Sequence, residues 1–227
     1  MRQIIRLSAG GEQIRIRLSN TIGDAPITAG AASVALRDHD AVIDPGDSPA
    51  RDLFRPAGGD DSDQCVVLSD PIDLPVANLA ELAVSLYFPE ETTGSTVHGM
   101  AFQTNAISSA GDFTLETDVP VETARCSRGS FTGVDVAVTA PRWRHRLPGR
   151  FDHGRRELDA GHRPSLARLH LADRLAASGE AMTGVLNLGI AGNRLLHPTR
   201  PMEYANFGLA HWRALIVTSS PSPAYRT

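Results

Sequence analysis

One stretch of the chain combines a strand-like apolar run with a polar glycine turn, the combination that α/β proteins use to hold ligands. The apolar run from Gly184 to Ile190 leads into the turn Gly192-Asn193-Arg194. Such a run is typical of a parallel strand buried on both faces, and open α/β sheets bind ligands at the carboxyl ends of these strands. We therefore predict that this turn lies beside a ligand. For Asn193, stabilisation of the turn itself is an equally good interpretation.

A second group of chemistry-bearing residues lies in the segment 141–170, which is crowded with Arg, His, Pro and Gly. Its histidines are His145, His153, His162 and His170. Their spacing is irregular and no carboxylate or cysteine ligands converge on them, so we predict no metal site. The arginines between Arg142 and Arg168 could form a nucleic-acid patch, but the chain's net charge of −4 argues against that partner.

The stretch from Gly184 to Leu196 resembles the second conserved block of the SGNH (GDSL-type) esterases and lipases. The resemblance implies that Gly192 offers a backbone N–H to an oxyanion hole, and that Asn193 lies where intact relatives contact substrate. It also implies hydrolysis of an ester or an acylated carbohydrate by serine acyl transfer, with no cofactor.

The nucleophile block of that family is missing from the sequence. An SGNH hydrolase opens its catalytic domain with a strand and a Gly-Asp-Ser-Ile-Thr-Asp-Gly turn, and the segment 141–170 stands in that place. All 22 residues of the Lys and Arg total are Arg, which indicates a GC-rich gene. With GC-rich codons, the residues from Gly149 to Arg156 can be written GGG CGA TTC GAT CAC GGA CGG CGC. Translated from the second base, this DNA encodes Gly-Asp-Ser-Ile-Thr-Asp-Gly.

The tail shows the same behaviour. Codons for His211 to Ser219, translated from the third base, permit Leu-Ala-Arg-Phe-Asp-Arg-Asp-Val-Leu. We hypothesise a compensated frameshift over 141–170 and a second frameshift after Ala210 that truncates the protein. The serine nucleophile and the Asp-x-x-His pair of the family are then absent, so we assign no catalytic residue and expect no esterase activity. Gly192 and Asn193 remain as candidate oxyanion and substrate residues.

The elements before this region all have the pattern of strands and turns. The segment Ile14 to Leu18 alternates, which predicts isoleucines and leucine in a core and arginines in water. Gly10-Gly11 before it predicts a hairpin with the strand Ile4 to Leu7. Further predicted strands are Ala32 to Arg37, Gln64 to Leu68, Leu82 to Phe88, Met100 to Thr104, and Gly133 to Val138.

These strands predict an N-terminal all-β antiparallel sandwich, jelly-roll-like, over residues 1–140. Three pieces resemble the β-sandwich domain that precedes the catalytic domain in one group of SGNH hydrolases: Arg2 to Ser8, Arg15 to Asn20, and Thr132 to Val136. The alternative is a non-catalytic, carbohydrate-binding sandwich module.

After the sandwich we expect the aberrant segment 141–170, an incomplete α/β (flavodoxin-like) SGNH fragment over 171–210, and an aberrant tail over 211–227. Within the fragment, Leu171 to Ala177 has helical spacing. The strand near Val185 to Ile190 should lack proper neighbours, because the strand before it is lost with the first block and those after it are never made.

Composition adds few constraints on function. The chain has 227 residues and 41% hydrophobic residues, ample for a packed core. No apolar run approaches the roughly 18 residues of a membrane span, and the start is not a signal peptide, although intact relatives are often secreted. The two cysteines, Cys65 and Cys126, form one disulfide or remain free.

Overall fold

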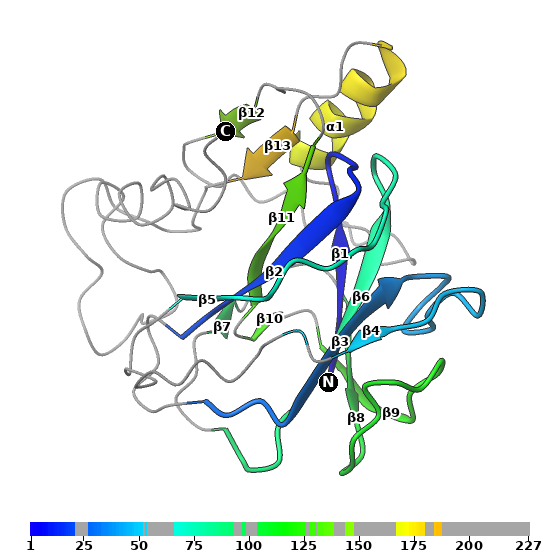
Figure 1. The fold of residues 1–227 in the computed structure, drawn as a ribbon, viewed down its shortest axis with the longest axis vertical. Helices are drawn as coiled ribbons and strands as arrows, with labels where there is room; N and C mark the ends of the chain where they lie inside the picture. The colour runs from blue at the N-terminus through cyan, green and yellow to red at the C-terminus, as the bar shows by residue number, and fades with distance from the viewer. Residues whose placement is uncertain are drawn as a thin grey trace, which may run out of the picture.

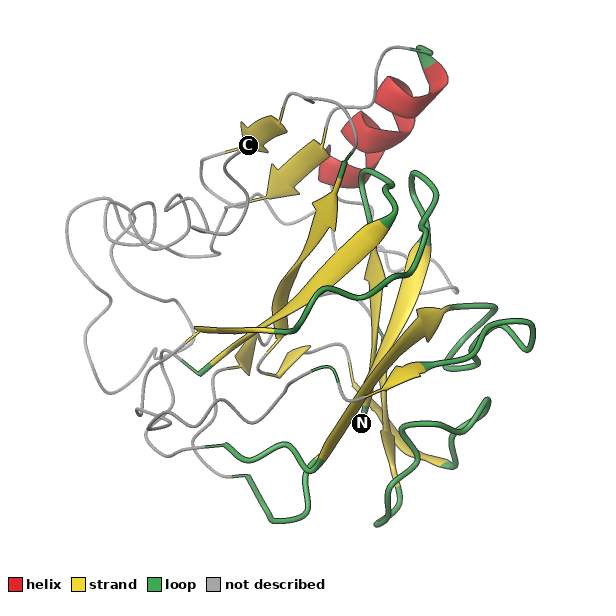
Figure 2. Ribbon diagram, in the orientation of Figure 1, coloured by secondary structure: helices red, strands yellow, loops and turns green. Residues whose placement is uncertain are grey.

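The chain forms antiparallel β-sheets with a small parallel unit beside them (Figure 1). The computed structural model describes residues 1–20, 27–51, 53, 66–92, 97–98, 104–125, 128–129, 131–138, 144–147, 167–179 and 184–187. Figure 2 shows that strands dominate these residues, with one described helix. The predicted all-β sandwich agrees with this architecture.

The larger sheet has six antiparallel strands in the order β4-β3-β6-β1-β8-β9. Its strands are β1 (Arg2–Arg6), β3 (Ala31–Leu36), β4 (Ala50–Arg51), β6 (Glu81–Tyr87), β8 (Asn105–Ser108) and β9 (Val121–Arg125). The centre of the sheet is formed by β6, which pairs with β1 on one side and β3 on the other.

The second sheet has three antiparallel strands in the order β11-β2-β5. Its strands are β2 (Gln13–Ser19), β5 (Val66–Leu68) and β11 (Phe131–Ala137). A separate two-stranded ladder joins β7 (Val97–His98) and β10 (Arg128–Gly129). The predicted strands over 32–37, 64–68, 82–88 and 133–138 overlap β3, β5, β6 and β11, so these four predictions are confirmed.

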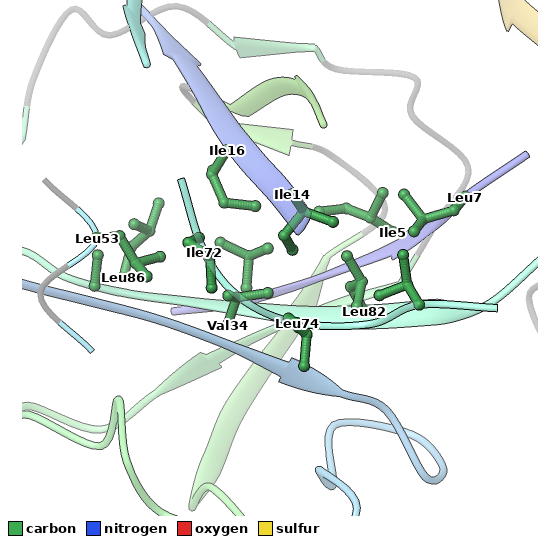
Figure 3. Packing of buried hydrophobic residues seen from close by; sticks show 13 residues of the cluster. Ile5, Leu7, Ile14, Ile16, Val34, Leu53, Ile72, Leu74, Leu82 and Leu86 are labelled. Atoms are coloured by element: carbon green, nitrogen blue, oxygen red, sulfur yellow. The ribbon is translucent and has the colours of Figure 1, made fainter. Parts of the chain in front are cut away.

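The hydrophobic core lies between the two sheets (Figure 3). From the larger sheet, alternate residues of β6 enter it, namely Leu82, Val84 and Leu86. From the second sheet, Ile14 and Ile16 of β2 point toward them. The remaining buried members are Ile5, Leu7, Ala32, Val34, Leu53, Ile72, Leu74 and Val76. The period of two along each strand is what delivers these side chains to one face.

The prediction for β2 is right for its apolar residues and wrong for its arginines. Ile14 and Ile16 are fully buried. Arg15 and Arg17 are half-buried instead of lying in water. The reason is visible for Arg17, whose Nη2 lies 2.9 Å from Asp135 Oδ2 on the neighbouring strand β11.

The predicted hairpin between the first two strands is wrong. β1 and β2 belong to different sheets, and Gly10-Gly11 carries the chain from one sheet to the other. Gly11 N–H donates to Val76 O (2.9 Å), and Val76 N–H donates to Gly11 O (2.8 Å). A Cβ on Gly10 would collide with Val76 O, and one on Gly11 with Ala137 O. The two glycines are therefore needed because other backbone segments pass close to them. In the sequence alone, the same glycine pair is indistinguishable from a hairpin turn.

Two loops cover the outer face of the six-stranded sheet, and a buried arginine forms hydrogen bonds to both of them. Arg2 is 1% exposed. Its Nε donates to Ser85 Oγ (2.8 Å), and its Nη1 donates to Ala41 O (2.6 Å) and Thr117 O (3.0 Å). Its Nη2 donates to Glu116 O (2.6 Å). One side chain thus ties two loops to the centre of the sheet.

The parallel unit consists of β12 (Arg144–Leu147), α1 (Ala167–Ala177) and β13 (Gly184–Asn187). β12 and β13 pair in parallel, and α1 lies between them in sequence and packs against β13. The prediction that β13 lacks a preceding neighbour is therefore wrong. Pairing uses main-chain hydrogen bonds, so the polar side chains of β12 do not prevent it. The helix begins at Ala167, four residues before the predicted Leu171.

Other predictions fall outside the described residues. Cys65 and Cys126 are among them, as is the tail 211–227. Of the predicted strand Met100 to Thr104, the structure describes Thr104 alone, which lies just before β8 and not in a strand.

Candidate functional site

The parallel pairing of β12 with β13 places the ends of these two strands at one edge of a small sheet. Leu147, the last residue of β12, lies opposite Asn187, the last residue of β13. Because the strands are parallel, the chain leaves both of them at the same edge. The segment from Gly149 to Arg156 follows β12, and the turn that contains Gly192 follows β13.

The predicted site residues Gly192 and Asn193 themselves lie outside the described residues, as does Arg194. Their roles stay predictions. What the structure describes is the strand that leads to them: β13 ends at Asn187, and its Val185 is buried. The parallel pairing of β13 and the burial of Val185 agree with the strand that the apolar run predicts.

Sequence reasoning missed the contacts between this parallel unit and the sandwich. Arg6, the last residue of β1, pairs with Asp173 of α1 across 2.7 Å. Ser8 accepts a hydrogen bond from the backbone N–H of Val185. Arg6 and Asp173 are 167 positions apart in sequence, so no local pattern could have linked them.

The histidines of the segment 141–170 are spread over separate parts of the chain. His145 belongs to β12 and His170 to α1, whereas His153 and His162 lie outside the described residues. Across the part of the chain that the structure describes, no group of three or more His, Cys, Asp and Glu residues could hold a metal ion. His39 is exposed, with Nδ1 2.9 Å from Asp38 Oδ2, a contact between chain neighbours within one turn.

A hollow of about 440 Å³ opens beside the start of β2 and the end of β11. Its lining residues are Glu12, Gln13, Asp73, Pro75, Ala137 and Val138. The hollow is lined by two carboxylates, those of Glu12 and Asp73. The Asp73 carboxylate already accepts a hydrogen bond from the side-chain amide of Gln13. This lining offers no hydroxyl or thiol nucleophile, and the hollow does not resemble an acyl-transfer site.

Comparison with known proteins assigns the chain to no family. No protein-family model matches the chain, and no curated protein matches it significantly. None of the helices that the structure describes is long and apolar enough to cross a membrane.

Proposed function

We propose that the chain is a frame-damaged relative of the SGNH ester hydrolases, with an N-terminal jelly-roll-like sandwich and an incomplete α/β catalytic fragment. The observation that carries the proposal is the order β12, α1, β13 together with the parallel pairing of its strands. In that family a strand runs directly into the nucleophile turn. Here β12 ends at Leu147, and the codons for a Gly-Asp-Ser-Ile-Thr-Asp-Gly turn begin at Gly149.

The second support is the position of the oxyanion turn relative to that block. The parallel pairing of β12 and β13 supports this arrangement, because the chain leaves two parallel neighbours at the same edge. In the intact enzyme the nucleophilic serine would follow the first of these strands and Gly192 the second. In the intact enzyme the serine would attack an ester carbonyl while a histidine accepts its proton. The Gly192 N–H would stabilise the oxyanion that forms.

The chain as written is expected to have lost this activity. Glycine N–H groups contribute to catalysis only where a nucleophile generates the oxyanion that they stabilise. We predict that a fluorophosphonate probe does not label the chain. Covalent labelling of a serine in the purified protein would contradict the proposed loss.

The family assignment is tested by sequencing the gene. Sequencing of codons 135 to 227 should show codons that encode the Gly-Asp-Ser-Ile-Thr-Asp-Gly string in the second frame over positions 149 to 156. Codons that exclude this string would overturn the assignment.

A repaired gene provides the functional test. Restoring the frame over 141–170 and after Ala210 should produce a protein that a fluorophosphonate labels and that hydrolyses p-nitrophenyl acetate. The matched control replaces the restored nucleophilic serine by alanine, which should abolish both signals. A repaired protein that remains unlabelled would show that the acyl-transfer proposal is wrong.

A further inference from the structure

The carboxyl end of β1 contacts the parallel unit through two adjacent polar groups. Arg6 Nη2 lies 2.7 Å from Asp173 Oδ1, and the two side chains are 22% and 43% exposed. Two residues further on, Ser8 Oγ accepts a hydrogen bond from Val185 N–H across 3.0 Å. The first contact reaches α1 and the second reaches β13, so two of the unit's three elements meet one short stretch of the sandwich.

The hydrogen bond to Ser8 shows to which side of β13 the backbone N–H of Val185 points. In a parallel strand, the backbone N–H groups of successive residues point alternately toward the two neighbouring positions. One side of β13 is occupied by β12. Since Val185 N–H is bonded to Ser8, it points to the other side, where no strand pairs with β13 among the described residues. The serine hydroxyl thus takes the place of a strand partner.

Each of the two contacts lies beside a buried apolar residue. Val185 is 3% exposed, and Ala172, the neighbour of Asp173, is 1% exposed. An unpaired backbone N–H is costly in such a place, and an open strand edge invites pairing with other chains. The Ser8 hydroxyl accepts this N–H and so satisfies the buried backbone donor.

We propose that the stretch from Arg6 to Ser8 is an intramolecular docking site, at which the sandwich binds the Val185 N–H of β13 and holds α1 through Asp173. The partner is formed by α1 and β13 of this same chain. The inference does not depend on the proposed esterase ancestry, because it rests on contacts between described residues. It assigns the sandwich a role as the support of the parallel unit.

Hydrogen exchange of the full chain, resolved over residues 171–187, tests the docking site. Ser8→Ala removes the acceptor of Val185 N–H, and we expect the amide of Val185 to exchange about three to ten times faster. Arg6→Asp should accelerate exchange in α1 about two- to fivefold, because it replaces a half-exposed ion pair by repulsion. The exchanged pair Arg6→Asp with Asp173→Arg should restore the rate in α1 to within about twofold of wild type.

Two matched controls separate docking from general loss of stability. Ser69 Oγ accepts the N–H of Ile16 inside the sandwich, as Ser8 does for Val185. Arg17 pairs with Asp135 at exposures of 27% and 29%, close to those of Arg6 and Asp173. Ser69→Ala and Asp135→Asn should therefore accelerate exchange around β2 and leave residues 171–187 unchanged.

Three results would count against docking. The proposal is refuted if Ser8→Ala leaves the Val185 amide unchanged, or if that amide exchanges in wild type as fast as in an unfolded peptide. Failure of the charge exchange to restore α1 refutes the Arg6–Asp173 part. None of these results bears on the codons at 149 to 156, so the two proposals fail independently.

Discussion

The guanidinium group of Arg2 bonds to three segments that are far apart in sequence. Ser85 belongs to β6, whereas Ala41 and Thr117 belong to two loops on the outer face of the sheet. Burial lowers the pKa of Arg2, and the negative charge of Asp118 opposes that shift. An arginine nevertheless stays ionised at any ordinary pH. The buried charge is stabilised by hydrogen bonds to neutral acceptors, which fixes the loops as well as the side chain.

Arg2→Ala should lower the free energy of unfolding by about 3 kcal/mol or more, because it empties the place of a buried side chain and removes its hydrogen bonds to Ser85 Oγ, Ala41 O and Glu116 O. Arg2→Lys should lose most of the same stability, since one ammonium group cannot reach the acceptors that the planar guanidinium reaches. Urea unfolding followed by far-ultraviolet circular dichroism measures both. Arg17→Lys, on a half-exposed pair, is the control and should change stability by less than about 1 kcal/mol. An Arg2→Ala variant as stable as this control would contradict the argument.

At the level of elements, the sequence predicts strands far better than it predicts their partners. Alternation along β2 and the apolar residues of β6 identify those strands, because the period of two is a local property. The pairing of β1 with β6 depends on residues about 80 positions apart, and a glycine pair suggested a nearer partner. Similarly, the apolar run of β13 predicts a strand, whereas its neighbour β12 carries Arg144, His145 and Arg146 and shows no strand pattern. Polar strands of this kind are recognised only through their partners.

Substitutions at the sheet-to-sheet crossing test the reason for the glycine pair. Gly10→Ala and Gly11→Ala should each destabilise the chain by about 1–3 kcal/mol, because the added methyl group meets a backbone carbonyl that cannot move aside. Gly133→Ala in β11 is the matched control, since nothing lies within 4 Å of the place that its methyl group would occupy. That variant should be neutral or more stable by up to about 1 kcal/mol. Thermal unfolding compares the three variants, and equal effects at all three positions would refute the close-approach argument.

At the scale of the whole molecule, the main buried cluster among the described residues belongs to the sandwich. Every residue of the main buried cluster lies between Ile5 and Leu86, and Val134 and Val136 of β11 pack against it. Within the described part of the chain, the parallel unit contributes none of the cluster's residues, and it contacts the sandwich at Arg6 and Ser8. Folding should therefore be dominated by the sandwich, with the parallel unit depending on it and not the reverse.

This dependence predicts that residues 1–140, expressed alone, fold cooperatively and unfold in urea at nearly the same midpoint as the full chain. The matched control is residues 1–125, which lack β11 and so leave β2 paired on one side with the three residues of β5. Loss of β11 also uncovers the core at Val134 and Val136, so the shorter fragment should lose most of its cooperative transition. Far-ultraviolet circular dichroism against urea distinguishes the two fragments. If residues 1–140 fail to fold while the full chain folds, the segment from Ala167 to Asn187 must stabilise the sandwich, and the direction of support inferred from Arg6 and Ser8 is reversed.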